Sequence, residues 1–327
     1  MSAKAPVPDI IAAAAQARIL ISSEGAARVA AFFLSARGAA GLFRDRAGRP
    51  DLYYSVFGLG GLIALGVGLP QPRDVRRCLD AEAGVTKEES FTDCVSRIRC
   101  LRCLNLLGDV QPGDALKFEQ SVARLERYRS ADGGYSHERE HAPQGTVYAA
   151  YLVEQAHRDA GIAWRDPERT ITALDTLCTP DGGYTNHSGT PRGSTTATAA
   201  AAVLLIRHGK CQPARRAVDY LARQRHPDGG YRASQAAPLP DLLSTATALY
   251  AESLCEPLTD KPPFRPTAAF IEGLWNGDSG FRSQAADPVS DVEYTFYALL
   301  ALGALAAIHP SQPKALPPAA VSCQTSL

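Results

Sequence analysis

The chain has 327 residues, of which 45% are hydrophobic and 21% charged, a composition that excludes disorder and supplies a sizeable core. Its 34 Lys and Arg residues balance its 34 Asp and Glu residues, so no overall field attracts nucleic acid or an anionic membrane surface. No apolar run approaches the roughly 20 residues that a membrane-spanning helix needs. We therefore expect a cytoplasmic protein with no membrane span and no nucleic-acid partner, whose 8 cysteines are reduced and buried.

An internal repeat organises the chain. An aromatic residue recurs every 44 to 50 residues, at Phe43, Phe91, Tyr135, Tyr184, Tyr231 and Phe281. In the last four repeats the preceding residues read Asp-Gly-Gly or Asp-Ser-Gly, a turn in which glycine tolerates positive φ and Asp bonds the neighbouring backbone. A fixed period of this length is typical of proteins built from stacked helical pairs.

Each repeat contains two different helical segments. The first, as in residues 118–128 and 214–223, has apolar residues three or four apart and charges elsewhere, which predicts a helix with one exposed face. A polar loop of about ten residues follows the glycine turn. The second segment, as in residues 194–205, 242–250 and 294–302, is uncharged, which predicts a buried helix.

Six such pairs predict an all-α protein, a six-fold α/α barrel or toroid of helical-pair repeats of about 48 residues, in which exposed outer helices surround buried inner ones. The toroid is expected to span residues 1–310, with degenerate first and second repeats. Residues 311–327, rich in Pro and Ser, are expected to form a C-terminal tail. A curved open solenoid has the same local signature and stays an alternative.

The inner helices share a pattern at their starts. Ten residues after the repeat aromatic stand Gly145, Ser194, Asp241 and Asp291, and Asp51 takes the matching place in the first repeat, whose loop is two residues shorter. Ser and Asp are typical N-cap residues. Parallel inner helices would place their positive dipole ends at one rim of the ring, where we expect an anion to bind.

Residues 278–302 resemble the last repeat of the β subunits of protein prenyltransferases, and the resemblance extends over about residues 25–308. The squalene and triterpene cyclases, which are more distant, share the Gly-Gly-aromatic helical-pair repeat. The resemblance implies a barrel around an apolar funnel that holds an isoprenoid diphosphate. It also implies a catalytic zinc at the rim and a helical α subunit as partner.

In the prenyltransferases, an Asp and a Cys two residues apart on one inner-helix start and a His on the last inner helix hold the zinc. The Asp matches Asp241, but Leu243 stands at the Cys position and Tyr294 at the His position. A leucine cannot bind a metal, and a neutral phenol is a poor substitute for imidazole. We therefore expect no zinc and no other cofactor, and the candidate catalytic residues are Asp241, Asp291 and Tyr294.

Candidate substrate-binding residues lie near the same rim and on the inner helices. Arg192, Arg232 and Arg282 stand in polar loops and are candidates for a diphosphate clamp. Arg97, on the second inner segment, stands where other repeats carry no charge and is a candidate anion ligand. The aromatic candidates are Tyr297 and two residues that share the repeat position of Tyr294, namely Tyr54 and Tyr148.

The sequence thus predicts a prenyltransferase-β-like protein that binds an isoprenoid, as the diphosphate or as another lipid, in an apolar barrel lumen and has diverged from zinc-dependent thiol prenylation. If the protein is an enzyme, it is expected to be a transferase of the prenyltransferase class. A non-catalytic lipid-binding protein and an interaction scaffold, with a helical α-subunit-like partner or a peptide, remain alternatives. A terpene-cyclase-like enzyme is a further alternative, although no Asp-x-Asp-Asp or Asp-Asp-x-x-Asp motif occurs.

Overall fold

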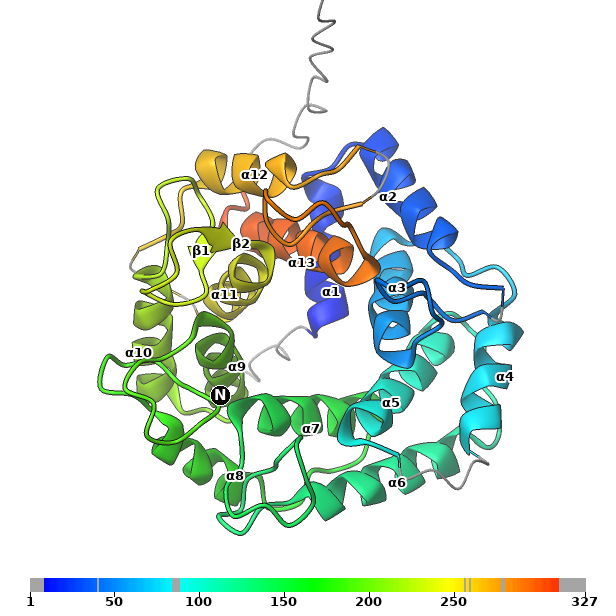
Figure 1. The fold of residues 1–327 in the computed structure, drawn as a ribbon, viewed down its shortest axis with the longest axis horizontal. Helices are drawn as coiled ribbons and strands as arrows, with labels where there is room; N and C mark the ends of the chain where they lie inside the picture. Colours follow the sequence, from blue (N-terminus) through cyan, green and yellow to red (C-terminus); the bar gives the residue numbers. More distant parts are fainter. Residues whose placement is uncertain are drawn as a thin grey trace, which may run out of the picture.

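In the computed structural model, which describes residues 9–39, 41–83, 89–255, 257–258, 260–277 and 280–311, two concentric layers of helices form a ring (Figure 1). The inner helices are α3 (Leu52–Leu65), α5 (Phe91–Leu106), α7 (Val147–Ala160), α9 (Thr195–Arg207), α11 (Leu242–Leu254) and α13 (Val292–Ile308). The outer helices are α2 (Ser23–Ser35), α4 (Pro72–Ala83), α6 (Asp114–Leu125), α8 (Pro167–Ala173), α10 (Cys211–Ala222) and α12 (Phe264–Gly273). Because α13 packs against α3, the ring is closed and the open solenoid is excluded.

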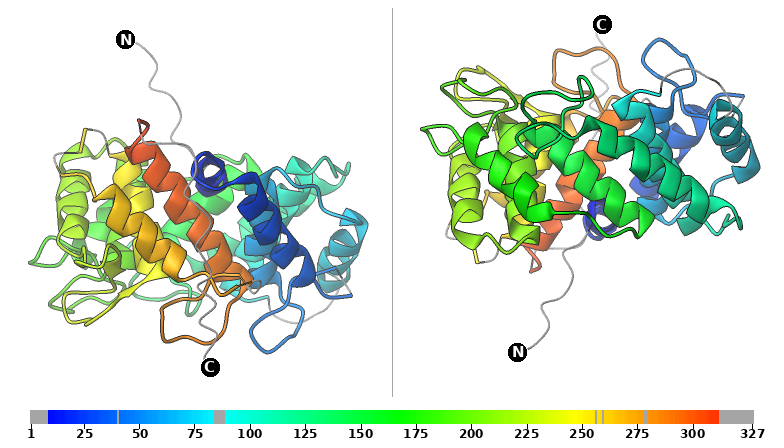
Figure 2. Two further views of the ribbon diagram at one scale, coloured as in Figure 1. Left: turned by 90° about the horizontal axis from the view of Figure 1, so that it is seen from above. Right: turned by 90° about the horizontal axis from the view of Figure 1, so that it is seen from below.

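Short elements complete the described chain. Helix α1 (Ile10–Ala15) continues into the 3-10 turn η1 (Gln16–Ile19), and the turns η2 (Glu126–Tyr128) and η3 (Leu174–Leu177) extend α6 and α8. Two short antiparallel strands, β1 (Tyr231–Arg232) and β2 (Pro240–Asp241), precede α11. The loops that lead into the inner helices gather at one end of the ring (Figure 2), and we call this end the rim.

Burial separates the two layers as the charge pattern predicts. Helix α13 is buried on nearly all sides. Helix α10 buries one face, made of Ala214, Ala217, Val218, Tyr220 and Leu221. Apolar residues three and four apart therefore turn the outer helices toward the inner layer. Since each fully buried aliphatic side chain of this kind contributes about 1.5–3 kcal/mol, this contact stabilises the toroid strongly.

Each inner helix begins with a side-chain cap. The carboxylates of the three predicted aspartates each accept a hydrogen bond, at 2.7–2.9 Å, from the backbone amide three residues further on. A cap of this kind satisfies one of the free amides of the helix terminus and is worth about 1 kcal/mol. The six caps are Asp51, Ser90, Thr146, Ser194, Asp241 and Asp291.

One cap lies a residue away from its predicted place. Gly145 was expected at the start of α7, but Thr146 accepts the capping hydrogen bond there. The loop of this repeat is therefore one residue longer than the loops of the last three repeats. Tyr148 is consequently the second residue of its helix and is in register with Glu293, so the prediction that it shares the position of Tyr294 is wrong.

Neighbouring repeats are joined at the rim by backbone hydrogen bonds. The amide of Thr195, the first residue of α9, donates to the carbonyl of Ala233 in the next rim loop at 2.9 Å. The amide of Leu242, the first residue of α11, donates to the carbonyl of Ser283 at 2.8 Å. These amides are the groups that an anion would need at a helix terminus, so the expected anion site does not form at α9 and α11.

Helix α1 packs into the seam between α13 and α3 (Figure 1). Its close approach to α13 requires Gly303, because a Cβ added there would lie 2.0 Å from the carbonyl oxygen of Ala13. The N-terminal helix thus covers the place where the last repeat meets the first, toward the end of the ring away from the rim (Figure 2).

The expectation about the cysteines needs correction, and the expectation about the C-terminal tail concerns residues outside the described structure. The expectation that all cysteines are buried is wrong: Cys178 and Cys211, at the ends of outer-layer segments, are exposed, and Cys78 and Cys255 are only half-buried. Cys323 and the predicted tail, from residue 312 onward, lie outside the described residues. In the ranges given above, no helix combines the length and the apolar character needed to cross a membrane.

Candidate functional site

One stripe of each inner helix is half-exposed although the rest of the helix is largely buried. The stripe begins at the second helical residue, which is half-exposed in all six inner helices: Tyr53, Thr92, Tyr148, Thr196, Leu243 and Glu293. Because outer helices cover the other sides, water reaches these residues from the rim and from the centre of the ring. The stripe therefore outlines the lumen of the toroid.

Aromatic side chains of α3 and α13 contact one another at the lumen, and Tyr148 of α7 lies near them. We define the aromatic cluster as Tyr53, Tyr54, Phe57, Tyr148, Tyr294 and Tyr297. The rings of Tyr53 and Phe57 lie edge to face with their centroids 5.0 Å apart, and Phe57 lies 5.5 Å from Tyr297. Tyr148 interacts electrostatically with Tyr53 and Tyr297 across the ring. Contacts of this geometry hold the rings in fixed orientations.

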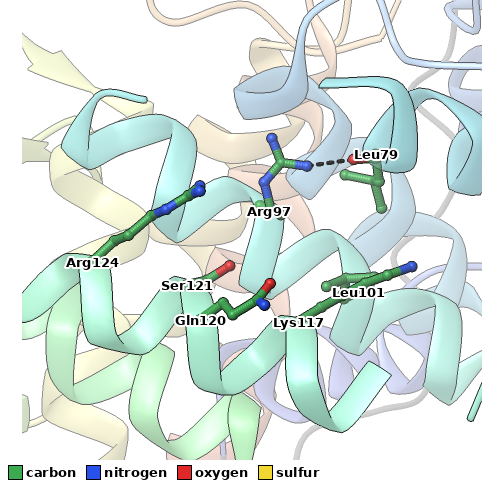
Figure 3. A pocket seen from close by; sticks show the side chains of 7 residues that line it. All are labelled: Leu79, Arg97, Leu101, Lys117, Gln120, Ser121 and Arg124. Atoms are coloured by element: carbon green, nitrogen blue, oxygen red, sulfur yellow. Dashed lines mark hydrogen bonds between the residues drawn. The ribbon is translucent and has the colours of Figure 1, made fainter. Parts of the chain in front are cut away.

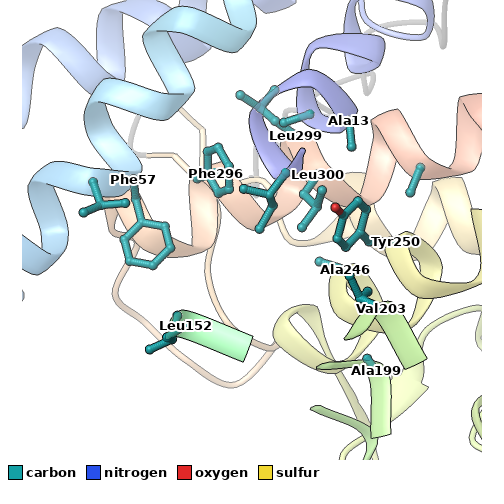
Figure 4. Close-up of a cluster of buried hydrophobic side chains, with 14 of the residues drawn as sticks. Ala13, Phe57, Leu152, Ala199, Val203, Ala246, Tyr250, Phe296, Leu299 and Leu300 are labelled. Atoms are coloured by element: carbon teal, nitrogen blue, oxygen red, sulfur yellow. The ribbon is translucent and has the colours of Figure 1, made fainter. Parts of the chain in front are cut away.

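The other side of the lumen carries small side chains. At the sixth helical position α3 and α7 have Phe57 and Leu152, whereas α9 and α11 have Ala200 and Thr247. Figure 4 shows Phe57 and Leu152 on one side of the ring and Val203 on the other. The side chains at this position are therefore larger on α3 and α7 than on α9 and α11.

Among the six second-position residues Glu293 is the one carboxyl. Its Oε1 accepts a hydrogen bond from the Tyr53 hydroxyl at 2.6 Å, and its Oε2 makes no hydrogen bond to a described residue. Burial raises the pKa of Glu293 to about 7, and the negative charge of Asp291 adds to this shift. The hydrogen bond from Tyr53 and the positive charge of Arg46 oppose the shift. Glu293 therefore exchanges a proton near neutral pH in aromatic surroundings.

Arg46 ties the first repeat to the last at the rim. Its Nε donates to Asp291 Oδ2 at 2.6 Å and its Nη2 donates to Asp287 Oδ2 at 2.8 Å. The guanidinium also lies 5.4 Å from the centre of the Tyr294 ring. Burial by itself raises the pKa of Asp287, but hydrogen bonds from Ser283 and Arg46 outweigh this effect and lower the pKa to about 2. Arg46 is thus held between two carboxyl groups.

Farther along the inner helices two more arginines have carboxylate partners. Arg99 of α5 lies 3.6 Å from Asp159 of α7. Arg207 of α9 donates to Glu154 of α7. Both arginines act electrostatically on Tyr151, a half-exposed residue of α7, which places them near the lumen. Arg99 and Arg207 therefore each have a carboxylate close to the guanidinium.

The sequence matches the family described as prenyltransferase alpha-alpha toroid domain over residues 75–237 and again over residues 197–326. The two matches together span most of the chain. The chain belongs to this family. No curated protein sequence matches it.

Solved structures with the toroid-family fold carry different chemistries. The type II terpene cyclase MstE from Scytonema is 15% identical, with a TM-score of 0.60 over 88% of this chain and 98% of that one. The Candida albicans protein geranylgeranyltransferase-I complexed with GGPP is 12% identical, with a TM-score of 0.62 over 86% and 90%. An unsaturated glucuronyl hydrolase from a Bacillus species is 14% identical, with a TM-score of 0.54 over 85% and 94%. At these identities the likeness shows the fold alone, so the lumen residues must decide the function.

The residues of this toroid-family member do not fit the zinc of protein prenyltransferases. Leu243 offers no ligand atom, and both Asp241 oxygens accept hydrogen bonds from Ser244, its amide and its hydroxyl, at 2.7 Å each. Burial raises the pKa of Tyr294 to about 12, which keeps its oxygen protonated. Within the described ranges no three His, Cys, Asp or Glu side chains group as metal ligands. The site therefore offers zinc a single carboxylate that already caps a helix.

The structure brings several predicted site residues together. Tyr54, Tyr148, Tyr294 and Tyr297 all lie in the aromatic cluster. Asp291 lies beside the cluster, where it caps α13 and binds Arg46. Asp241 caps α11 at another place on the rim. The two predicted catalytic aspartates are thus both engaged in structural hydrogen bonds.

Arg97 lies between the helix layers and not in the lumen. It lines a small pocket shown in Figure 3, whose walls are Leu79, Arg97, Leu101, Lys117, Gln120, Ser121 and Arg124. Its Nε donates to Glu89 at 2.6 Å and its Nη1 donates to the Leu79 carbonyl. This placement corrects the expectation that Arg97 contacts a lumen ligand. On α5 the residue nearer the lumen is Arg99, because two residues along a helix turn a side chain to the opposite side.

The three rim arginines stand in successive loops. Arg192 is exposed, and Arg232 and Arg282 are half-buried beside short strand pairings. The Nε atoms of Arg232 and Arg282 are buried and make no hydrogen bond to a described residue. No described residue is a common partner of the three, so the diphosphate clamp stays a prediction.

Sequence reasoning missed Tyr53 and Glu293. A signal was present, because an alignment of residues 51–57 with residues 291–297 sets Tyr53 opposite Glu293. Glu293 is also the acidic residue in the first turn of an otherwise apolar helix. The contact between Tyr53 and Glu293 could not be predicted from the sequence, because its hydrogen bond joins residues 240 positions apart across the seam of the ring.

Proposed function

We propose that the protein binds an isoprenoid chain in the lumen of the toroid, and that it does so in the cytoplasm. The aromatic cluster is the observation that carries the proposal. All of its rings except that of Phe57 are half-exposed, on helices whose other faces are buried. Leaving apolar surface in water costs about 25 cal/mol per Å², and a hydrocarbon chain beside Ala200 and Thr247 would cover that surface.

Two structures of similar fold guide the choice of probe. The Candida albicans geranylgeranyltransferase-I structure contains GGPP, and a structure of the Scytonema cyclase contains geranylgeranyl dihydroxybenzoate. Both ligands carry a geranylgeranyl chain, so compounds with this chain are the first to test. Zinc-dependent thiol alkylation is not part of the proposal, because Leu243 and Tyr294 stand at two of the three positions that the resemblance assigns to zinc ligands.

Filling the lumen tests the proposal. Thr247→Trp adds an indole to the small side of the lumen, and Leu116→Trp adds the same group at an exposed position of α6 as a control. We expect titration calorimetry to show binding of a geranylgeranyl compound by the wild type and by Leu116→Trp, and at least tenfold weaker binding by Thr247→Trp. Circular dichroism checks that both variants are folded. If no geranylgeranyl compound binds, the interaction scaffold becomes the better interpretation. If Thr247→Trp binds as tightly as the wild type, the chain does not lie on the small side of the lumen and the proposed site is wrong.

The Glu293 carboxyl favours a second candidate function, a terpene-cyclase-like enzyme. A protonated carboxyl can donate its proton to one alkene carbon of a bound chain, so that the π electrons form the C–H bond and the other carbon becomes a cation. Aromatic faces stabilise such a cation. A second alkene then attacks the cation to form a C–C bond, loss of a proton to water completes the ring, and Glu293 regains a proton from solvent.

Product analysis separates the two candidates. A cyclised product has the mass of its substrate but a different retention time, so we expect chromatography with mass spectrometry to detect it if the second candidate holds. Glu293→Gln should then abolish the product while chain binding persists, and Glu119→Gln, on the exposed face of α6, should leave it unchanged. Product formation by Glu293→Gln would rule out Glu293 as the acid. If the wild type forms no product, isoprenoid binding without catalysis is the function that remains.

A further inference from the structure

We infer that the lumen accepts an isoprenoid whose polar end is an uncharged hydroxyl group, held by the Tyr53–Glu293 pair, and discriminates against the diphosphate of the same chain. The inference rests on the proposed function, since it names the ligand class of the same site.

The position of the pair sets the orientation of a ligand. Tyr53 and Glu293 occupy the second residues of α3 and α13, at the rim end of the aromatic cluster. Phe57 and Tyr297 lie one helical turn farther into the ring and contact each other. A chain that lies along these rings places its polar end beside the Tyr53–Glu293 pair.

The pair has unused hydrogen-bonding capacity. Oε1 of Glu293 is occupied by the Tyr53 hydroxyl, whereas Oε2 makes no hydrogen bond to a described residue. An ionised Oε2 accepts a hydrogen bond, and a protonated one donates it. A ligand hydroxyl serves both states, because it is donor and acceptor at once. An ionised diphosphate can only accept hydrogen bonds, so it cannot donate one to the ionised carboxylate.

The charges around the pair disfavour an anion. Several groups interact electrostatically with Glu293, and they come from every element at the site. They are Tyr53 and Tyr54 of α3, Tyr148 of α7, Tyr294 and Tyr297 of α13, the cap Asp291 and Arg46 of the rim loop. The one cation among them, Arg46, is held by Asp287 and Asp291. One guanidinium between two carboxyl groups leaves no positive excess for a diphosphate.

Arginines deeper in the ring do not supply the missing charge. Arg99 faces Asp159, and Arg207 binds Glu154 and the Tyr250 hydroxyl. A diphosphate would have to separate one of these pairs, whereas a hydroxyl group needs no cation. The lumen is therefore suited to a prenyl alcohol.

Comparative affinities test the inference. Geranylgeraniol, geranylgeranyl diphosphate and inorganic diphosphate are titrated into the full chain by calorimetry at concentrations below micelle formation. We expect the wild type to bind the alcohol at least tenfold more tightly than the prenyl diphosphate, and inorganic diphosphate not to bind. Glu119→Gln is the matched control for removal of a surface carboxylate and should keep the same ratio.

Variants at the pair show whether it is the cause. Glu293→Gln keeps the shape but not the negative charge, so the preference for the alcohol should fall at least fivefold. Tyr53→Phe keeps the ring but removes the hydroxyl, so the variant should bind the alcohol severalfold more weakly and bind the prenyl diphosphate with unchanged affinity. Circular dichroism and thermal unfolding show whether each variant is folded.

The outcomes distinguish the inference from the proposed function. Equal or tighter binding of the prenyl diphosphate by the wild type overturns the inference and leaves the isoprenoid-binding function standing; Arg232→Ala and Arg282→Ala would then reveal whether the rim arginines hold the phosphates. An unchanged preference in Glu293→Gln overturns the role of the pair. Binding of neither chain-bearing compound overturns the proposed function itself.

Discussion

Two tyrosine–glutamate pairs in this toroid have the same chemistry and different surroundings. Between the helix layers, Glu252 Oε2 accepts hydrogen bonds from Tyr231 and Arg225, both at 3.0 Å, and Glu252 is 0% exposed. In the lumen, Glu293 accepts a bond from Tyr53 at 2.6 Å and has no arginine of its own. Burial raises the pKa of both carboxyl groups to about 7.

The difference shows that a shifted pKa does not by itself identify a functional carboxyl. Tyr231 is the aromatic of its repeat, and Arg225 stands six residues before it and contacts its hydroxyl. Arg129 and Tyr135 have the same spacing and the same contact in an earlier repeat. A contact that recurs from repeat to repeat is explained by packing. Glu293 has no counterpart at the other second positions, so packing of the repeat does not account for it.

The largest effect is expected when Glu252 loses its cation. Arg225→Ala leaves a fully buried carboxyl without its ion-pair partner, and we expect the free energy of unfolding at pH 7 to fall by about 3 kcal/mol. The comparison variant beside the lumen pair, Arg46→Ala, removes a guanidinium that binds Asp287 and Asp291 and is 38% exposed, and it should cost less than about 1 kcal/mol. Urea unfolding measures both values. Similar losses in the two variants would mean that the Arg46 contact is as structural as the Arg225 contact.

The pH dependence of stability tests the state of Glu293. Its pKa is near 4.5 in the unfolded chain and about 7 in the folded protein. As the pH rises between these values, the unfolded chain releases its proton first, so this residue lowers the stability of the wild type progressively and has its full effect above pH 7. Glu293→Gln has no proton to release, so its stability should match the wild type at pH 4 and exceed it by about 1 kcal/mol at pH 8, a value reduced for partial exposure of the carboxyl.

Calorimetric unfolding of the two proteins across this pH range is the measurement. Glu252 is present in both, so its own titration cancels in the difference. A difference that does not change with pH would show that Glu293 titrates normally.

An effect of similar size is expected at Asp241, where two variants test whether a rim carboxyl outside the lumen pair is structural. Its carboxylate caps α11, and an amide oxygen can take the same role. Asp241→Asn should therefore be tolerated, whereas Asp241→Ala should lower the free energy of unfolding by about 1 kcal/mol. Thermal unfolding compares the two. If Asp241→Asn abolished an activity without a change in stability, a catalytic carboxylate would replace the cap.

The smallest expected effect is that of metal removal. We expect the purified protein to retain no stoichiometric zinc after dialysis, since Leu243 and Tyr294 leave Asp241 without fellow ligands. Elemental analysis measures the metal content, and treatment with a chelator should not change the unfolding temperature. One tightly held zinc per chain would refute this prediction.

The sequence by itself determined the repeat, the pairing of exposed and buried helices and most of the caps. The glycine turns, the capping Asp241 and Asp291 and the uncharged inner segments act within a single repeat, so the order of nearby residues suffices to predict them. Tyr54, Tyr294 and Tyr297 could be proposed as site residues for the same reason, because they follow the caps at fixed helical spacing.

Only the tertiary structure decided which side chains meet in the lumen. Ring closure brings Tyr53 to Glu293 over 240 positions, and no local pattern encodes that contact. One extra loop residue moved Tyr148 to a different helical position, and a rotation of about 100° per residue turned Arg97 toward the outer layer and Arg99 toward the lumen. The direction in which each side of a helix points depends on how all the neighbouring helices pack. The local sequence therefore predicts the helix but not the partners of each side chain.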